Sequence, residues 1–104
     1  MLTHCVFFWL RLTLTADDVA AFERGLRTLL TIPGVVDGAV GTPAPTNRPV
    51  VERSYSYALM LRFKDMAGHD AYQSHPIHSQ FHTRFERFWT NAVVYDFSDR
   101  GAPA

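Results

Sequence analysis

Side chains that can move protons lie close together in the second half of the chain: Tyr72, His75, His78 and His82. Pro76 suits the first turn of a helix, on which His78 and His82 are four residues apart and therefore share a face. Tyr72 could donate a hydrogen bond to a carbonyl oxygen of a bound ligand while His78 accepts or relays the proton. The spacing predicts an acid–base pair, Tyr72 with His78, facing a cavity between helix and sheet.

The rest of the cavity lining is expected from other parts of the chain. His4 and Tyr57 fall on the helix-facing sides of two strands that we expect to be neighbours. His75 and Phe81 are further lining candidates, since they flank His78 in the same helical segment. A purely structural role fits His78 equally well, because a buried imidazole can be satisfied by a backbone carbonyl or by Tyr72.

Metal and nucleophile chemistry are disfavoured by the sequence. A metal site needs three or four converging ligands, and the helical spacing of His78 and His82 supplies only two. The sequence has no HExxH motif, no paired cysteines and no obvious carboxylate on the same face. Cys5 falls on a buried strand and is expected to be an inert small hydrophobe, and no nucleophile-elbow motif is present. We therefore expect neither a metal nor a cofactor.

The composition is that of one small domain over residues 1–104. Ten basic and ten acidic residues give a formal net charge of zero, which disfavours nucleic acid as a partner. A single cysteine fits a reducing compartment. The apolar run over 5–10 is too short to span a bilayer and lacks the features of a signal peptide, so a cytoplasmic protein without a membrane partner is expected.

Periodicity and helix-capping residues predict an α+β domain with the order β-α-β-β-α-β. Residues 42–53, rich in proline, should form an exposed mobile loop. The expected core runs over about 3–99, as a ferredoxin-like antiparallel sheet with its helices on one face. The expected elements are a strand over 3–12, a helix from Thr15 to about Leu30, a strand over 35–40, a strand over 54–64, a helix over 66–74, a helix from Pro76 to near Trp89 and a strand over 91–98.

Two strands carry apolar side chains on a face that no helix is expected to cover. Phe7 and Trp9 alternate with the core residues of the first strand, and Met60 does so in the third. In the same stretch, Tyr55 and Tyr57 are expected together on the helix-facing side. An exposed apolar face of this size is typical of an interface, so we expect a homodimer formed through the sheet.

At this point four segments together resemble the stress-responsive A/B-barrel (Dabb) family, from about Thr3 to Asp99. They read HCVFFWL, SYSYALMLRF, AYQSHPIHSQF and FWTNAVVYDF. The resemblance implies a ferredoxin-like homodimer whose sheets form a dimeric α/β barrel. A plant member closes a polyketide chain by aldol condensation without a cofactor, and its catalytic tyrosine and histidine match Tyr72 and His78, with a pocket histidine matching His4.

This chain departs from that plant cyclase at two pocket positions. Tyr57 stands where the cyclase has a histidine, and Gly25 or Leu26 where it has a tyrosine. The resemblance therefore implies the acid–base pair but not the substrate. Three functions stay open: a cofactor-independent cyclase- or isomerase-type enzyme acting on an apolar carbonyl compound, a non-catalytic ligand-binding or stress-protective dimer, and a haem or monooxygenase-like dimeric barrel.

Overall fold

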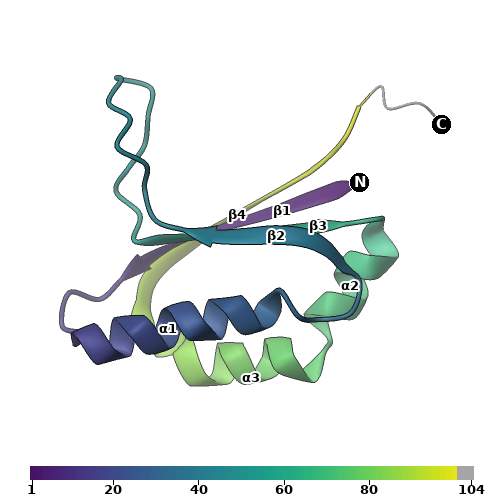
Figure 1. Cartoon of the computed structure of the whole chain (residues 1–104), viewed down its shortest axis with the longest axis horizontal. Helices are drawn as coiled ribbons and strands as arrows, with labels where there is room; N and C mark the ends of the chain where they lie inside the picture. The colour runs from purple at the N-terminus through teal and green to yellow at the C-terminus, as the bar shows by residue number, and fades with distance from the viewer. Residues whose placement is uncertain (101–104) are drawn as a thin grey trace.

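The computed structural model describes residues 1–100, and residues 101–104 of the expected domain lie outside that range. The described chain forms one antiparallel sheet in the order β2-β3-β1-β4, with its helices on one face (Figure 1). This is the expected α+β ferredoxin-like arrangement. The elements are β1 Leu2–Leu10, α1 Ala16–Leu29, β2 Val35–Gly41, β3 Tyr57–Phe63, α2 Met66–Gln73, α3 Pro76–Phe85, the 3₁₀ turn η1 Glu86–Phe88 and β4 Trp89–Ser98.

Each helix begins where the sequence supplies a capping group. Thr15 and Asp18 form a reciprocal capping box at α1, with distances of 3.1 and 3.0 Å between side-chain oxygen and backbone nitrogen. The Asp65 carboxylate accepts a 3.0 Å hydrogen bond from the backbone N–H of Gly68 at the start of α2. Pro76 occupies the first turn of α3. The predicted starts of all three helices are therefore confirmed.

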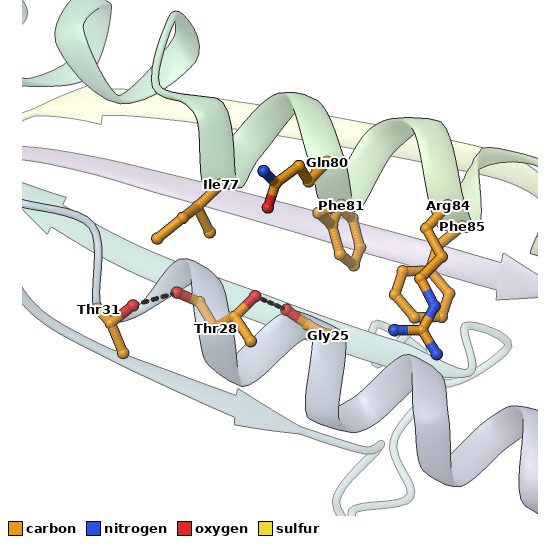
Figure 2. Close-up of a pocket in the computed structure, with 8 residues that line it drawn as sticks. All are labelled: Gly25, Thr28, Thr31, Ile77, Gln80, Phe81, Arg84 and Phe85. Carbon is orange, nitrogen blue, oxygen red and sulfur yellow. Dashed lines mark hydrogen bonds between the residues drawn. The ribbon is translucent and has the colours of Figure 1, made fainter.

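Helices α1 and α3 lie side by side, and a groove of about 310 Å³ runs between them (Figure 2). On one wall the hydroxyl of Thr28 in α1 and that of Thr31 just after it donate to backbone carbonyls of α1, each at 2.6 Å. Gly25 allows Phe85 of α3 to pack directly on α1, because a Cβ atom there would lie 2.4 Å from a ring carbon of Phe85.

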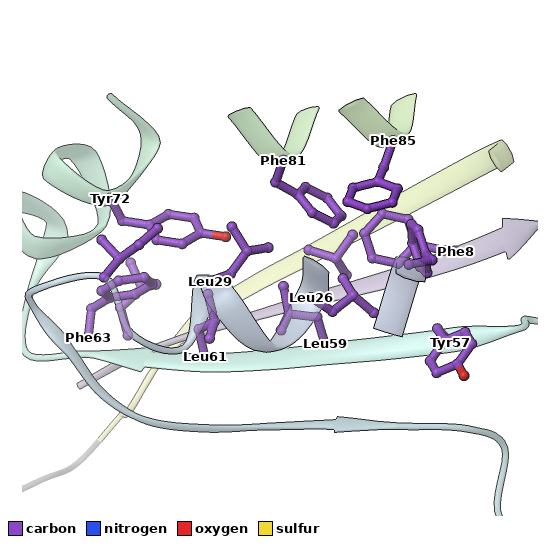
Figure 3. Packing of buried hydrophobic residues seen from close by; sticks show 14 residues of the cluster. Phe8, Leu26, Leu29, Tyr57, Leu59, Leu61, Phe63, Tyr72, Phe81 and Phe85 are labelled. Carbon is purple, nitrogen blue, oxygen red and sulfur yellow. The ribbon is translucent and has the colours of Figure 1, made fainter. Parts of the chain in front are cut away.

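The core lies between the sheet and the helices (Figure 3). The alternation of β1 and β3 places every second residue in it, as the sequence predicts. From β1 the buried apolar residues are Leu2, Val6 and Phe8, from α1 Phe22, Leu26 and Leu29, from β3 Tyr57, Leu59, Leu61 and Phe63, and from the later elements Tyr72, Phe81 and Phe85, with Ile32 after α1.

The start of β3 differs from the prediction. The strand begins at Tyr57, and the ring of Tyr55 packs edge-on against Phe7 on the opposite face, with ring centroids 5.0 Å apart. The hydroxyl of Ser56 accepts a 2.9 Å hydrogen bond from the backbone N–H of Leu10, and this contact precedes the regular ladder. The expectation that Tyr55 and Tyr57 share one face is therefore wrong.

The end of α3 also differs. The sequence predicts that the helix runs to near Trp89, but α3 ends at Phe85, η1 follows, and Trp89 is the first residue of β4. Arg11, just after β1, holds this turn twice: its backbone N–H donates to the carbonyl of Phe88 at 2.9 Å, and its guanidinium Nε donates to the carbonyl of Arg87 at 2.7 Å. These contacts fix where the chain leaves the helix layer and enters the sheet.

The second face of the sheet carries aromatic side chains and, in the described residues, no helix (Figure 1). The loop before β3 projects to this side, so that Tyr55 joins Phe7, Trp9 and Tyr95 around a hollow of about 220 Å³. The Trp9 indole N–H donates to the hydroxyl of Ser54 at 3.0 Å. Tyr95 is 64% exposed. Most residues of the 42–53 loop are exposed and without helix or strand, as expected.

Among residues 1–100, no helix has the length and apolar character needed to cross a membrane.

Candidate functional site

A cavity of about 390 Å³ lies between the sheet and the segment formed by α2 and α3. Its walls are mainly apolar, with a few polar groups at one end and at the rim. The lining residues are His4, Val6, Phe8, Leu29, Leu59, Tyr72, Gln73, His78, Phe81, His82, Trp89, Ala92 and Val94. Four of the predicted site residues, His4, Tyr72, His78 and Phe81, therefore meet here.

Tyr72 near the end of α2 is almost wholly buried, with 1% of its surface exposed. Its ring packs against Phe63 and His78, with centroids 5.2 and 4.9 Å away. Its hydroxyl makes no hydrogen bond within residues 1–100. Every fully buried side-chain polar atom in that range has a partner, so the hydroxyl oxygen of Tyr72 is not fully buried. The hydroxyl must therefore open to the cavity, which agrees with its direction away from α2 in Figure 3. Burial raises the pKa of Tyr72, so the phenol stays a neutral donor.

His78 in α3 is half-buried beside that ring. Loss of solvent lowers the pKa of His78, and the neighbouring imidazoles of His82, His4 and His69 lower this pKa further. The imidazole is therefore neutral near pH 7, where it can accept a proton. A neutral donor and a neutral acceptor thus lie edge to face at one end of an apolar cavity.

His4 of β1 forms the floor of the same end and is 5% exposed. Its Nδ1 donates to the carboxylate of Asp96 on β4 at 2.5 Å, and its ring lies 5.9 Å from that of Tyr72 and 5.3 Å from that of His69. Sequence reasoning missed Asp96 and His69. Asp96 lies directly opposite His4 in the register of β1 with β4, and that register is not visible in the sequence.

Two other predicted lining residues lie elsewhere. Tyr57 pairs with Phe8, whereas His4 pairs with Leu61, so Tyr57 is four residues, or about 14 Å, further along the sheet. Its hydroxyl donates to the Glu23 carboxylate at 2.9 Å, and burial, with that contact, raises the pKa of Tyr57. Tyr57 is therefore not part of the cavity.

His75 does not line the cavity either, and its side chain caps a helix. Its Nδ1 accepts a 3.1 Å hydrogen bond from the backbone N–H of Ile77 at the start of α3. His82 lies at the exposed rim, where its ring is 3.1 Å from the Glu86 carboxylate and 5.9 Å, between centroids, from Trp89.

The groove between α1 and α3 (Figure 2) holds no comparable chemistry. Its polar side chains are Gln80, Arg84 and two threonines whose hydroxyls are bonded to carbonyls of α1. The guanidinium of Arg84 lies 4.9 Å from the ring centre of Phe85. None of the residues lining it is a histidine, tyrosine, cysteine or carboxylate. The His–Tyr cavity is therefore the better candidate site.

Several solved structures share this fold. A Dabb family protein from Mesorhizobium loti with a ferredoxin-like fold is 22% identical, with a TM-score of 0.78 over 96% of this chain and 97% of that one. A hydroxynitrile lyase from Passiflora edulis is 17% identical, with a TM-score of 0.80 over 99% and 96%. A dimeric ferredoxin-like protein of unknown function from Thermobifida fusca is 23% identical, with a TM-score of 0.76 over 93% and 89%.

A search of curated proteins gives no significant match. The family model described as the stress responsive A/B barrel domain, however, matches residues 2–99. Because that match spans nearly the whole chain, and the fold agrees with it, this protein belongs to the stress-responsive A/B-barrel (Dabb) family.

Proposed function

We propose that this protein binds a small apolar carbonyl compound in the cavity and uses Tyr72 and His78 as an acid–base pair on it. The observation that carries the proposal is the Tyr72 hydroxyl, which opens into an apolar cavity and makes no hydrogen bond within the described chain. A ligand oxygen is the natural partner for such a donor, because the hydroxyl faces the cavity and has no competing acceptor in the described chain.

The chemistry follows from the protonation states of the two groups. With the carbonyl oxygen of the ligand on Tyr72, the neutral imidazole of His78 can take a proton from the adjacent carbon. The C–H electrons then form an enolate, whose negative oxygen is stabilised by the Tyr72 hydrogen bond. If the ligand is conjugated, the protonated His78 can return the proton at the far carbon of the dienolate, which gives an isomerase. Alternatively the enolate carbon attacks a second carbonyl of the same ligand, and the new alkoxide takes the proton from His78, which gives a cyclase. The likeness in fold to a hydroxynitrile lyase supports an enzymatic use of this architecture.

Exchange of carbon-bound protons tests the base without knowledge of the natural substrate. Acetophenone is the probe, and its methyl protons are followed by NMR in deuterated water with and without the protein. We expect the protein to accelerate exchange and His78→Gln to reduce the catalysed rate by about 10²–10⁴-fold. Tyr72→Phe should weaken exchange, whereas Tyr95→Phe, which removes a hydroxyl from the other sheet face, should not.

The non-catalytic alternative has its own outcome in this experiment. If acetophenone shifts the backbone amide signals of α2 and α3 but exchange is no faster than in buffer, the cavity is a binding site without a base. Exchange that survives His78→Gln within a factor of two or three would contradict the assigned role of His78. Loss of exchange counts only if the variant keeps the melting temperature of the parent protein.

We propose further that two copies associate through the sheet face that carries Phe7, Trp9 and Tyr95. In support, these side chains surround a hollow on a sheet face that no helix of the described residues covers, and Tyr95 is largely exposed there. The Thermobifida fusca relative in fold is itself dimeric. Light scattering at low micromolar concentration should give twice the chain mass.

A further inference from the structure

Three metal-ligating side chains from three separate elements converge beside the polar end of the cavity, and one of them, His4, also lines it. They are His4 from β1, His69 from α2 and Asp96 from β4, and one ligand atom from each lies within 4.8 Å of the other two. Such a cluster is invisible to a search for local motifs, because its members are brought together only by the pairing of β1 with β4 and by the position of α2 over the sheet.

We propose that these three side chains form a site for a divalent transition-metal ion of the Zn²⁺ class. Two imidazoles and one carboxylate are the donor set of many mononuclear sites, and three protein ligands leave a position open for water or another oxygen ligand. Neither Tyr72 nor His78 is a ligand of this metal site, so the site does not depend on the acid–base role proposed for them.

The distances fit with small side-chain movements. Ligand atoms about 2.1 Å from a tetrahedral ion lie about 3.4 Å from one another. The His4–Asp96 pair, now a hydrogen bond of 2.5 Å, must open, and the remaining separations, at most 4.8 Å, must close. Asp96 has the freedom to adjust, because 42% of its side chain is exposed on an edge strand.

The surroundings favour a cation. Nδ1 of His69 lies 3.2 Å from the carboxylate of Asp70, and such an outer carboxylate commonly fixes the ring of a metal-bound histidine. With neutral imidazoles, Asp96 and Asp70 leave the cluster negative. No Lys or Arg is among the described residues lining the cavity. The ring of Phe63 packs edge-on against His69, with centroids 5.8 Å apart, and limits its rotation.

An ion at this site would lie close to the Tyr72 end of the cavity. The ring of His4 lies 5.9 Å from that of Tyr72, so the open coordination position would be at the same end of the cavity as the phenol. A metal there could hold an oxygen atom of the ligand that the cavity accepts.

Cobalt binding tests the site directly. The untagged protein is treated with a chelator, dialysed and titrated with Co²⁺, whose visible absorption becomes intense on tetrahedral coordination. Zinc retained after gel filtration is then measured by mass spectrometry. We expect one ion per chain. His69→Phe keeps an aromatic ring against Phe63 while it removes the ligand, and Asp96→Asn removes the charge, so each should weaken binding by more than about tenfold.

His82→Phe is the matched control, because this histidine lies at the rim and contacts Glu86 rather than the cluster. It should bind cobalt like the parent protein. The proposal is overturned if the parent chain shows no tetrahedral cobalt spectrum and retains no zinc, or if His69→Phe and Asp96→Asn both bind as tightly as the control. Far-ultraviolet circular dichroism identifies a variant that fails to fold, in which case the other variant decides.

Discussion

Replacing Gly25 by alanine should destabilise the protein, although alanine is the better helix former. Gly25 is buried in α1 where this helix meets α3. A Cβ atom added there would lie 2.4 Å from Cε2 of Phe85 and 3.1 Å from two further atoms of that ring. Carbon atoms in ordinary contact are about 3.5–4.0 Å apart, so the ring or the helix must move.

The sign of the change in the free energy of unfolding depends on two opposing terms, helix propensity and packing. In the interior of a helix, exchange of glycine for alanine is worth about 0.8–1 kcal/mol. Forcing an extra methyl group into a packed core costs about 1–3 kcal/mol. Phe85 is 2% exposed and held by the rings of Phe22, Phe81 and Phe88, with centroids 5.7, 5.3 and 5.0 Å away, so it has little room to retreat. We expect the packing term to exceed the propensity term, for a net loss of about 1 kcal/mol.

Urea unfolding at one fixed chain concentration measures this loss, since any dimer makes stability depend on concentration. Ala20→Gly, at an exposed position of the same helix, calibrates the propensity term alone. The double variant Gly25→Ala with Phe85→Leu should recover part of the loss, with a coupling of about 0.5–3 kcal/mol. A Gly25→Ala protein as stable as the parent, or more stable, would refute this account of the α1–α3 contact.

Three further outcomes are expected. Trp9→Asp should give monomer or aggregate in light scattering, because it places an unpaired charge in the proposed interface at a cost of several kcal/mol; a dimer of unchanged mass would argue against that interface. Burial lowers the pKa of His78 from its ordinary 6.5, so the unfolded chain takes up more protons below about that pH and stability falls on acidification. Between about pH 7.5 and about pH 5.5 the urea midpoint should fall less in His78→Gln than in the parent protein. An equal fall in both would exclude His78 as the source of the pH dependence. Limited trypsin digestion should cut first in the 42–53 loop, at Arg53, since the bond after Arg48 is followed by Pro49 and resists trypsin; cleavage starting in a strand would contradict the predicted mobility.

Most of the fold could be predicted because its signals are local. Thr15 and Asp65 mark helix starts through hydrogen bonds to residues three positions later, and alternation in β1 and β3 depends only on neighbouring residues. The errors occur where a local pattern continues past its element. The apolar spacing of α3 runs on through Phe88 to Trp89, but the contacts of Arg11 with η1 end it.

The site was predictable only in part, for a related reason. Tyr72 and His78 come from consecutive helices, so the spacing along the chain indicates that they meet. Tyr57 shares a strand face with Leu61, and only the register shows that Leu61, not Tyr57, is opposite His4. Asp96 is about ninety residues from its partner and depends on the same unknown register on the other side of β1. Alternation predicts which face a side chain occupies, whereas its position along that face requires the pairing.

The two hydrogen bonds from Arg11 to η1 have a consequence for the width of the cavity. Helix α3 carries one wall of the cavity and β4 carries another, and the three residues of η1 are the only covalent link between them. The angle of that link sets the separation of the walls, and it is fixed from outside by a residue that does not line the cavity. A change at Arg11 is therefore expected to widen or narrow the cavity while every side chain that lines it is retained.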